Sequence, residues 1–171
     1  ALAERAQGLK LRVLAYDPFI GAEAPGVELT SLEDLYAQAD IVTVHVPLNP
    51  RTTGLISAEV LEKMRHGVIL INCSRGGVID EDALAAALKN GKVAGAALDV
   101  FAVEPLPREH PLRACERVVL TPHLGASTRE AQFKVGISAA EQVVAYLRHG
   151  QVENAVNMPS VDARVSQVLA P

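Results

Sequence analysis

The sequence predicts an α/β fold built on a doubly wound parallel sheet. Short, continuous apolar blocks alternate with longer stretches of helical periodicity, as expected for strands buried on both faces of a sheet. The blocks follow one another in βαβα order, which is the order of a doubly wound sheet. The chain has 171 residues, of which 49% are hydrophobic, and this is enough for one packed domain.

Five apolar blocks are the expected strands. They cover residues 11–16, 41–46, 68–72, 93–100 and 118–120. Helices are expected at residues 31–38, 57–64 and 80–90. The third of these helices has acidic residues in its first turn and Gly91 at its end, which are common signals for the start and the stop of a helix.

A longer helix is expected from Ser127 to about His149. The four residues from Ser127 to Glu130 have the form of a capping box, and Gly150 is a suitable terminator. The apolar residues that recur on one face of this helix are Phe133, Ile137, Ala140, Val144 and Leu147. Residues 151–171 are weakly periodic and contain Pro159, so we expect them to leave the domain core.

The beginning of the chain departs from the expected plan. Residues 1–7 look like the end of a helix that stops at Gly8, whereas a complete fold of this type opens on a strand. We therefore expect the sheet to be incomplete at the N-terminus. The expected domain covers residues 1–150, and residues 151–171 form a tail.

Charge and composition exclude several classes of protein. The chain carries 16 Lys and Arg against 20 Asp and Glu, without a long run of like charge, so no nucleic-acid partner is expected. It has neither an apolar stretch of about 18 residues nor a signal-peptide pattern, so we expect no membrane partner and a cytoplasmic location. Cys73 and Cys115 are too few for a disulfide framework, and no residue grouping has metal-ligand spacing, so no metal is expected.

Asp17 follows the expected strand 11–16 and precedes Pro18. In dinucleotide-binding folds, a carboxylate at the end of the second strand holds the adenosine ribose hydroxyls and disfavours the extra phosphate of NADP. A turn after a strand explains the Asp-Pro pair equally well. No Gly-rich loop upstream decides between the two interpretations.

Arg75 closely follows the expected strand 68–72, in the string NCSRGGVID. The carboxyl ends of strands in an open α/β sheet face the ligand crevice, and the two glycines allow close approach of the backbone. The planar guanidinium of arginine can bind a carboxylate bidentately. A surface arginine in a turn is the alternative.

Glu104 and His123 also lie past the carboxyl ends of expected strands, so both can reach the same crevice. A histidine with a carboxylate partner is a suitable proton carrier for the oxidation of a secondary alcohol, because the carboxylate orients the ring and favours its charged form. A structural histidine is the alternative for His123 taken alone. The distance between the two side chains cannot be read from the sequence.

The remaining polar candidates carry weaker signals. His45 lies in the expected strand 41–46, just before Pro47, where it either lines the crevice or has a core or loop role. We expect the other histidines, His66, His110 and His149, at the surface. Ser74 lacks a nearby base and a nucleophile-elbow pattern, so hydrolase chemistry is not supported.

Taken together, these strings resemble the D-isomer-specific 2-hydroxyacid dehydrogenase family, most closely its phosphoglycerate branch. The resemblance spans about residues 1–160 and runs through AYDP, ADIVTVHVPLNPRTTGLI, GVILINCSRGGVIDEDAL, GAALDVFAVEP, TPHLGAST and NAVNMP. It implies a Rossmann-like fold, an NAD-binding domain at residues 1–150, and NAD as the cofactor.

The resemblance also implies individual roles. Arg75 would bind the substrate carboxylate, His123 would take the hydroxyl proton as hydride leaves C2, and Glu104 would hold His123. The residues implied at the cofactor are Asp17, Pro18, Val46, Pro47, Thr52, Cys73, Ser74, Arg75, Asp99 and His123. The implied reaction is NAD-dependent oxidation of 3-phospho-D-glycerate to 3-phosphohydroxypyruvate, the entry into serine synthesis.

Two other functions are compatible with the same residues. A glyoxylate or hydroxypyruvate reductase would use the same Arg75, Glu104 and His123, and some members of the superfamily act as NAD-sensing scaffolds for protein partners. The family's Gly-rich phosphate loop and substrate domain do not occur in this sequence, so we expect no useful turnover from the isolated chain. Family members are usually dimers or tetramers, which implies a homo-oligomer.

Overall fold

The computed structural model describes residues 1–20 and 25–157. The chain divides into two compact units, one from Ala1 to His123 and the other from Leu124 onward. We call them unit 1 and unit 2 and describe each by itself.

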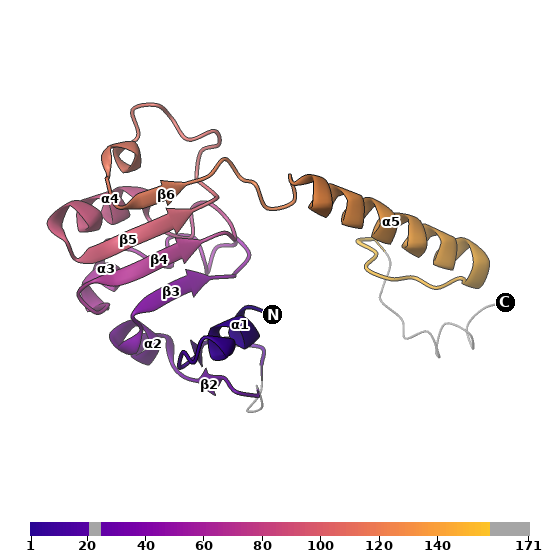
Figure 1. The fold of residues 1–171 in the computed structure, drawn as a ribbon, viewed down its shortest axis with the longest axis horizontal. Coiled ribbons are helices and arrows are strands. Elements are labelled where there is room, and N and C mark those ends of the chain that lie inside the picture. The colour runs from indigo at the N-terminus through magenta and orange to yellow at the C-terminus, as the bar shows by residue number, and fades with distance from the viewer. Residues whose placement is uncertain (21–24, 158–171) are drawn as a thin grey trace. The chain divides into compact units, whose positions relative to one another are not determined.

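Unit 1 contains two parallel sheets (Figure 1). The strands are β1 (Leu14–Ala15), β2 (Glu28–Leu29), β3 (Ile41–Val44), β4 (Val68–Asn72), β5 (Val93–Leu98) and β6 (Val118–Leu120). The larger sheet has the order β3-β4-β5-β6, and the smaller sheet pairs β1 with β2. Every one of these pairings is parallel, which confirms the predicted α/β class.

Side-chain caps define the starts of three helices in unit 1. The helices of this unit are α1 (Leu2–Gly8), α2 (Leu32–Gln38), α3 (Ala58–Lys63), α4 (Glu81–Asn90) and the 3₁₀ helix η1 (Pro111–Ala114). The side chains of Ser31, Ser57 and Asp80 accept hydrogen bonds from backbone N–H groups in the first turns of α2, α3 and α4. Gly91 ends α4 in the left-handed conformation, as predicted.

One face of the larger sheet carries the hydrophobic core. Val68 and Leu70 of β4 are buried on this face, together with the neighbouring positions of β3 and β5. Helix α4 packs on β5 and α3, and it adds Leu84 and Leu88 to the same core. Full burial of a leucine contributes roughly 1.5–3 kcal/mol to stability. This buried face is therefore a main source of stability for the larger sheet.

The opposite face of this sheet is more exposed than the sequence predicts. Ile41, Ile69 and Val119 alternate along their strands with core positions, and between 40% and 62% of each residue is exposed. Continuous apolar strands predicted burial on both faces. A strand's composition does not tell which of its two faces is covered by elements of the same unit, so this part of the prediction differs from the structure.

Several predicted strands are shorter in the structure. β1 covers two residues of the expected strand 11–16, β3 ends at Val44, and β5 ends at Leu98. The N–H of Asp99 still donates to the carbonyl of Asn72, but Asp99 forms a bend and Val100 lies outside the strand. β2 and η1 were not predicted, because elements of two and four residues are too short to show periodicity.

The described part of unit 2 is dominated by α5 (Arg129–His149). Its N-cap is Thr128, whose side chain accepts the N–H of Ala131. The N-cap therefore lies one residue after the predicted Ser127, and Ala131 at the third helical position cannot complete a capping box. Gly150 ends the helix as predicted. The predicted apolar face is exposed, with Phe133 71% exposed. Most of the predicted tail, residues 158–171, lies outside the described residues.

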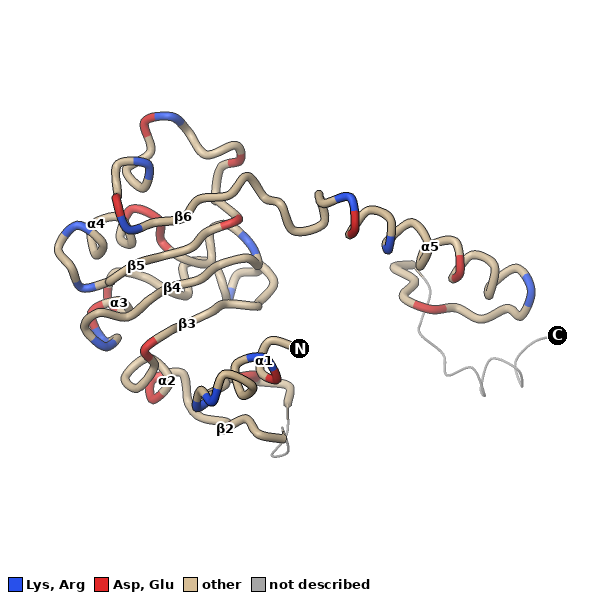
Figure 2. Tube along the Cα trace, viewed as in Figure 1, with Lys and Arg blue, Asp and Glu red and all other residues tan. Residues whose placement is uncertain are grey.

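Charged residues of both signs are interspersed along both units (Figure 2). Arg12 pairs with Glu28 of β2 at 2.7 Å, and its hydrogen bonds lower the pKa of the Glu28 carboxyl below the ordinary value. Arg65 pairs with Asp40 at 2.7 Å. Both pairs are exposed, so each contributes little to stability. Within residues 1–20 and 25–157, no helix has the length and apolar character needed to cross a membrane.

Candidate active site

The carboxyl ends of β3, β4, β5 and β6 lie along one edge of the larger sheet, because these strands all run in the same direction (Figure 1). The loops that leave β4, β5 and β6 carry Arg75, Glu104 and His123. Open α/β sheets bind their ligands at this edge. The strand-end edge of the larger sheet is therefore the candidate active site.

Glu104 and His123 form a hydrogen-bonded pair at this edge. Nδ1 of His123 lies 2.7 Å from Oε2 of Glu104. The other carboxylate oxygen of Glu104 accepts the N–H of Phe101 at 3.0 Å. The hydrogen bond from His123, followed by that from Phe101, holds the pKa of Glu104 below its ordinary value of 4.5. Their side chains are 36% and 49% exposed, so a solute can reach the pair.

His123 occupies an uncommon backbone conformation. Its φ is +54°, in the left-handed region that favours glycine, and its N–H donates to the carbonyl of Thr121 at 3.0 Å. Thr121 in turn donates its hydroxyl to Oδ1 of Asp99 at 2.5 Å, which links the ends of β5 and β6. A left-handed non-glycine residue costs on the order of 1–3 kcal/mol, and such residues cluster at functional sites.

The loop that carries Arg75 is organised by a buried amide. Asn72 ends β4, and its Nδ2 donates to the carbonyl of Arg75 at 3.0 Å. Its Oδ1 accepts both the N–H and the hydroxyl of Ser74, at 3.0 and 2.9 Å. The Arg75 side chain is exposed and donates through Nη1 to the Ser74 carbonyl at 2.7 Å. The strand end thus fixes the backbone of the loop and leaves the guanidinium at the surface.

Gly76 brings the Arg75 loop into contact with the loop that carries Glu104. A Cβ added to Gly76 would lie 1.8 Å from the carbonyl oxygen of Phe101. Real Cβ atoms do not approach a backbone oxygen so closely, so only glycine fits this position. The loops after β4 and β5 are therefore packed backbone to backbone.

The residues expected at the cofactor are spread along the strand ends. Asp17 follows β1 and is exposed, and its Oδ1 accepts the N–H of Phe19 at 2.9 Å, as in an Asx turn. Thr52 donates its hydroxyl to the carbonyl of Pro47 at 2.6 Å and accepts the N–H of Asn49, which closes the loop after β3. Asp17 therefore forms a turn and also places an exposed carboxylate just after a strand, so the two interpretations of the Asp-Pro pair are compatible.

These residues fit a dinucleotide in two respects. The exposed carboxylate of Asp17 at a strand end suits a ribose diol, and Asp99 places a second, largely buried carboxylate at the end of β5. Among the cofactor candidates, Val46 packs partly against the core, whereas Cys73 is exposed.

The prediction for His110 is wrong. It was expected at the surface, but its side chain is 16% exposed and its Nε2 lies 3.4 Å from Oε2 of Glu81. No local signal in the sequence places His110 beside Glu81, because the two residues belong to separate elements, η1 and α4. His66 and His149 are exposed, as predicted, and His45 is exposed with Nε2 3.0 Å from the hydroxyl of Thr43.

The role of Asn72 was also missed. A polar residue at the end of an apolar strand is the signal that could have revealed it, because a buried amide must find hydrogen-bond partners. In the described parts of the chain, no group of three or more His, Cys, Asp or Glu is placed to hold a metal ion.

The parallel sheet and the residues at its carboxyl edge define a nucleotide-binding α/β domain of the Rossmann type. Residues 1–125 match the family described as "D-isomer specific 2-hydroxyacid dehydrogenase, NAD binding domain". The chain therefore belongs to the D-isomer-specific 2-hydroxyacid dehydrogenase family. The cofactor expected from the sequence, NAD, is the cofactor of the matched domain.

Curated relatives and solved structures agree with this assignment. D-3-phosphoglycerate dehydrogenases of Archaeoglobus fulgidus and Bacillus subtilis are 47% and 46% identical over 99% and 94% of this chain. The chain spans about a third of the length of these relatives, 33% and 31%. An NAD complex of a formate dehydrogenase from Staphylococcus aureus has a TM-score of 0.79 and 29% identity, over 90% of this chain and 46% of that chain.

Proposed function

We propose that the whole protein is an NAD-dependent dehydrogenase of D-2-hydroxy acids whose substrate is 3-phospho-D-glycerate. The observation that carries the proposal is the Glu104–His123 hydrogen bond at the same strand-end edge as Arg75. Support for the substrate comes from the relatives named D-3-phosphoglycerate dehydrogenase, which are 46–48% identical to this chain. The product would be 3-phosphohydroxypyruvate.

His123 is the proton carrier in this proposal. Because Glu104 engages Nδ1, we assign the catalytic proton transfer to Nε2 of His123. In oxidation, the hydroxyl proton of the substrate moves to Nε2, the C2–H bond breaks, and the C2–O bond becomes a carbonyl. NAD, when bound, supplies the acceptor for the hydride. Glu104 stabilises the imidazolium that forms and keeps the ring oriented.

Arg75 binds the substrate carboxylate. Its guanidinium is exposed on a loop whose backbone is held by Asn72 and packed at Gly76. Among the described residues, no carboxylate forms an ion pair with Arg75, so the guanidinium is available to bind a substrate. A planar fork of donors matches the two oxygens of a carboxylate. The substrate would thereby be oriented with C2 toward His123.

The cofactor is assigned to the remaining strand-end residues. Asp17 would hold the adenosine ribose hydroxyls, Asp99 would face the nicotinamide carboxamide, and Thr52 would lie near the phosphates. The other positions proposed along the cofactor are Pro18, Val46, Pro47, Cys73 and Ser74. Asp17 is the residue that favours NAD over NADP, because its carboxylate would repel a 2′-phosphate.

We also propose that the domain organisation is the one predicted from the sequence. In the doubly wound order 3-2-1-4-5-6, β2 and β1 correspond to positions 3 and 2, and β3, β4 and β5 to positions 4, 5 and 6. A strand between β1 and β3, with the phosphate loop that follows it, would join the two sheets of unit 1.

We place the domain at residues 1–150, and we expect a homo-oligomeric enzyme in the cytoplasm.

The initial rate of NAD reduction by the whole protein tests the substrate. 3-Phospho-D-glycerate and D-glycerate are compared at equal concentration, and the phosphorylated acid should react about 10- to 100-fold faster, because hydrogen bonds to a charged group contribute roughly 1.5–3 kcal/mol. Comparable rates, or preference for D-glycerate, would instead favour a hydroxypyruvate or glyoxylate reductase. A glyoxylate reductase from Paecilomyes thermophila is 31% identical, with a TM-score of 0.79.

A further inference from the structure

A second histidine–carboxylate pair lies beneath the loop that carries Glu104. Oε2 of Glu81 is 3.4 Å from Nε2 of His110. Their side chains are 10% and 16% exposed, far less than those of Glu104 and His123. The pair comes from two elements, since Glu81 opens α4 and His110 precedes η1. None of the roles assigned above uses it.

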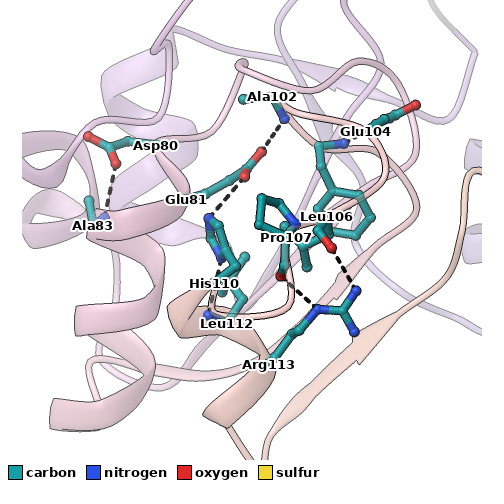
Figure 3. A network of polar contacts seen from close by, with 11 residues as sticks. Asp80, Glu81, Ala83, Ala102, Glu104, Leu106, Pro107, His110, Leu112 and Arg113 are labelled. Atoms are coloured by element: carbon teal, nitrogen blue, oxygen red, sulfur yellow. Dashed lines mark hydrogen bonds and ion pairs between the residues drawn. The ribbon is translucent and has the colours of Figure 1, made fainter.

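Glu81 also binds the backbone of the Glu104 loop. Its Oε1 accepts the N–H of Ala102 at 2.6 Å, and Figure 3 shows its side chain reaching from α4 to both Ala102 and His110. The preceding N–H, that of Phe101, donates to Glu104 itself at 3.0 Å. Two consecutive backbone N–H groups are thus held by two different carboxylates. Glu81 fixes the turn from which Glu104 holds His123.

The far end of the same loop is fixed from η1. Arg113 donates through Nη2 to the carbonyl of Leu106 at 2.8 Å and through Nε to that of Pro107 at 2.9 Å (Figure 3). His110 accepts the N–H of Leu112 at Nδ1, which orients its Nε2 toward Glu81. The loop is therefore held at Ala102 by Glu81 and at its end by Arg113.

The burial of Glu81 is costly unless both oxygens are satisfied. Desolvating a carboxylate is unfavourable, and burying it is tolerated when hydrogen bonds and an ion partner compensate. Ala102 satisfies one oxygen of Glu81 and His110 faces the other. The capping contact of Asp80 with the N–H of Ala83 fixes the first turn of α4, and hence the backbone from which Glu81 extends.

We propose that Glu81, held by His110, is a positioning residue for the Glu104–His123 pair. This inference rests on the proposed dehydrogenase function. Loss of Glu81 releases the N–H of Ala102, the turn at Phe101 loosens, and Glu104 no longer holds the His123 ring in the orientation that accepts a proton. Binding of NAD at the other strand ends is not affected.

The test compares variants of the whole protein in steady-state oxidation of 3-phospho-D-glycerate. Glu81→Ala should lower kcat about 10- to 100-fold, because small misplacements of catalytic groups have effects of this size. The KM for NAD should stay within about twofold. Glu81→Gln should recover most of kcat, because its amide oxygen still accepts the N–H of Ala102. Asp82→Asn is the matched control, since it removes the neighbouring exposed charge of α4 and should retain wild-type kcat.

Hydrogen exchange gives a readout that does not depend on turnover. Peptides covering residues 101–106 should exchange faster in Glu81→Ala than in the wild type, while peptides of β4 should be unchanged. His110→Asn should show a smaller change in both exchange and kcat, because Glu81 keeps its bond to Ala102. If Glu81→Ala fails to fold, His110→Asn carries the test. Faster exchange at residues 101–106 with unchanged exchange in β4 supports the positioning role, and unchanged exchange together with unchanged kcat overturns it.

Each outcome separates the inference from the proposed function. A wild-type protein without activity on any D-2-hydroxy acid refutes the proposed function. Unchanged exchange at residues 101–106 in Glu81→Ala refutes the contact between Glu81 and the loop, whether or not the wild type is active. An active wild type with normal kcat in Glu81→Ala overturns the positioning role. Faster exchange throughout unit 1, with kcat and the KM for NAD impaired together in Glu81→Ala and in Glu81→Gln, overturns it as well.

Discussion

At the scale of single residues, the candidate site joins exposed reactive groups to well-held backbone. The Arg75 side chain is exposed, whereas Asn72 at the end of β4 is almost fully buried. The side-chain amide of Asn72 donates to the Arg75 carbonyl and accepts the Ser74 N–H. Glu104 and His123 show the same division, since solvent reaches their side chains while Phe101 and Thr121 hold their loops. Chemistry that needs contact with a small substrate is compatible with this arrangement.

Replacement of Arg75 by lysine tests the carboxylate clamp. Arg75→Lys keeps the charge but loses the planar fork, so the KM for the hydroxy acid should rise about 10- to 100-fold, the range expected when a charged hydrogen bond is lost. Steady-state kinetics of the whole protein measure the change. Arg65→Lys is the control, because Arg65 pairs with Asp40 before β4 and not at the strand-end edge. An unchanged KM for the hydroxy acid in Arg75→Lys would rule out the clamp.

The lowered pKa of Glu104 predicts a pH dependence of stability. A carboxyl whose pKa is lower in the folded protein stabilises the fold above its ordinary pKa of 4.5. This contribution is lost as the pH falls from that value through the lower folded pKa. The urea midpoint of the wild type should therefore approach that of Glu104→Gln between about pH 6 and about pH 3. A difference between the two midpoints that stays constant over this range would contradict the prediction.

At the scale of elements, two glycines have different tasks. Gly91 ends α4 at φ +84° with open space around it, whereas Gly76 has negative or extended φ and meets the Phe101 carbonyl. The first position requires a backbone conformation, and the second requires the absence of a side chain. The loops after β4 and β5 can approach each other because of the second.

The two glycines give a matched pair of substitutions. Gly91→Ala should destabilise the chain by about 1–2 kcal/mol, the cost of a left-handed residue with a Cβ. Gly76→Ala should lower kcat strongly, because a Cβ 1.8 Å from the Phe101 oxygen displaces the loops of Arg75 and Glu104. Urea unfolding and steady-state kinetics measure the two effects. Normal kcat in Gly76→Ala would show that the contact between these loops is dispensable.

At the scale of the whole molecule, stability and chemistry occupy different parts of unit 1. The core lies on one face of the larger sheet and under α4, and the candidate site lies at the carboxyl edge of the same strands. A strand such as β4 therefore serves both, with Leu70 in the core and Asn72 at its end below Arg75. The rigid core places the loops, and the loops carry the reactive side chains.

Adjacent residues of β4 test this division. Leu70 is fully buried and Ile69 is 40% exposed on the other face. Leu70→Ala should destabilise the chain by about 2–5 kcal/mol, the range for a buried leucine. Ile69→Ala should cost less than about half as much, because less apolar surface leaves a buried environment. Equal shifts of the urea midpoint in the two variants would show that both faces of the sheet are equally buried.

Much of the fold could be predicted from local signals. Apolar blocks indicated β3, β4 and β6, and the acidic start and Gly91 indicated α4 within one residue of its bounds. The strand ends then indicated where Arg75, Glu104 and His123 would stand. These signals suffice because hydrophobic periodicity and capping act over a few neighbouring residues.

The contacts that join distant segments were decided by the tertiary structure. Glu81 and Ala102 are 21 positions apart, and no local pattern brings His110 to the same carboxylate. The sequence by itself determined the α/β class, the order of the main elements and the strand ends that carry the polar residues. Tertiary packing decided which sheet face is covered, how Gly76 meets Phe101, and which side chains pair, because these depend on the paths of loops that meet only in the folded chain.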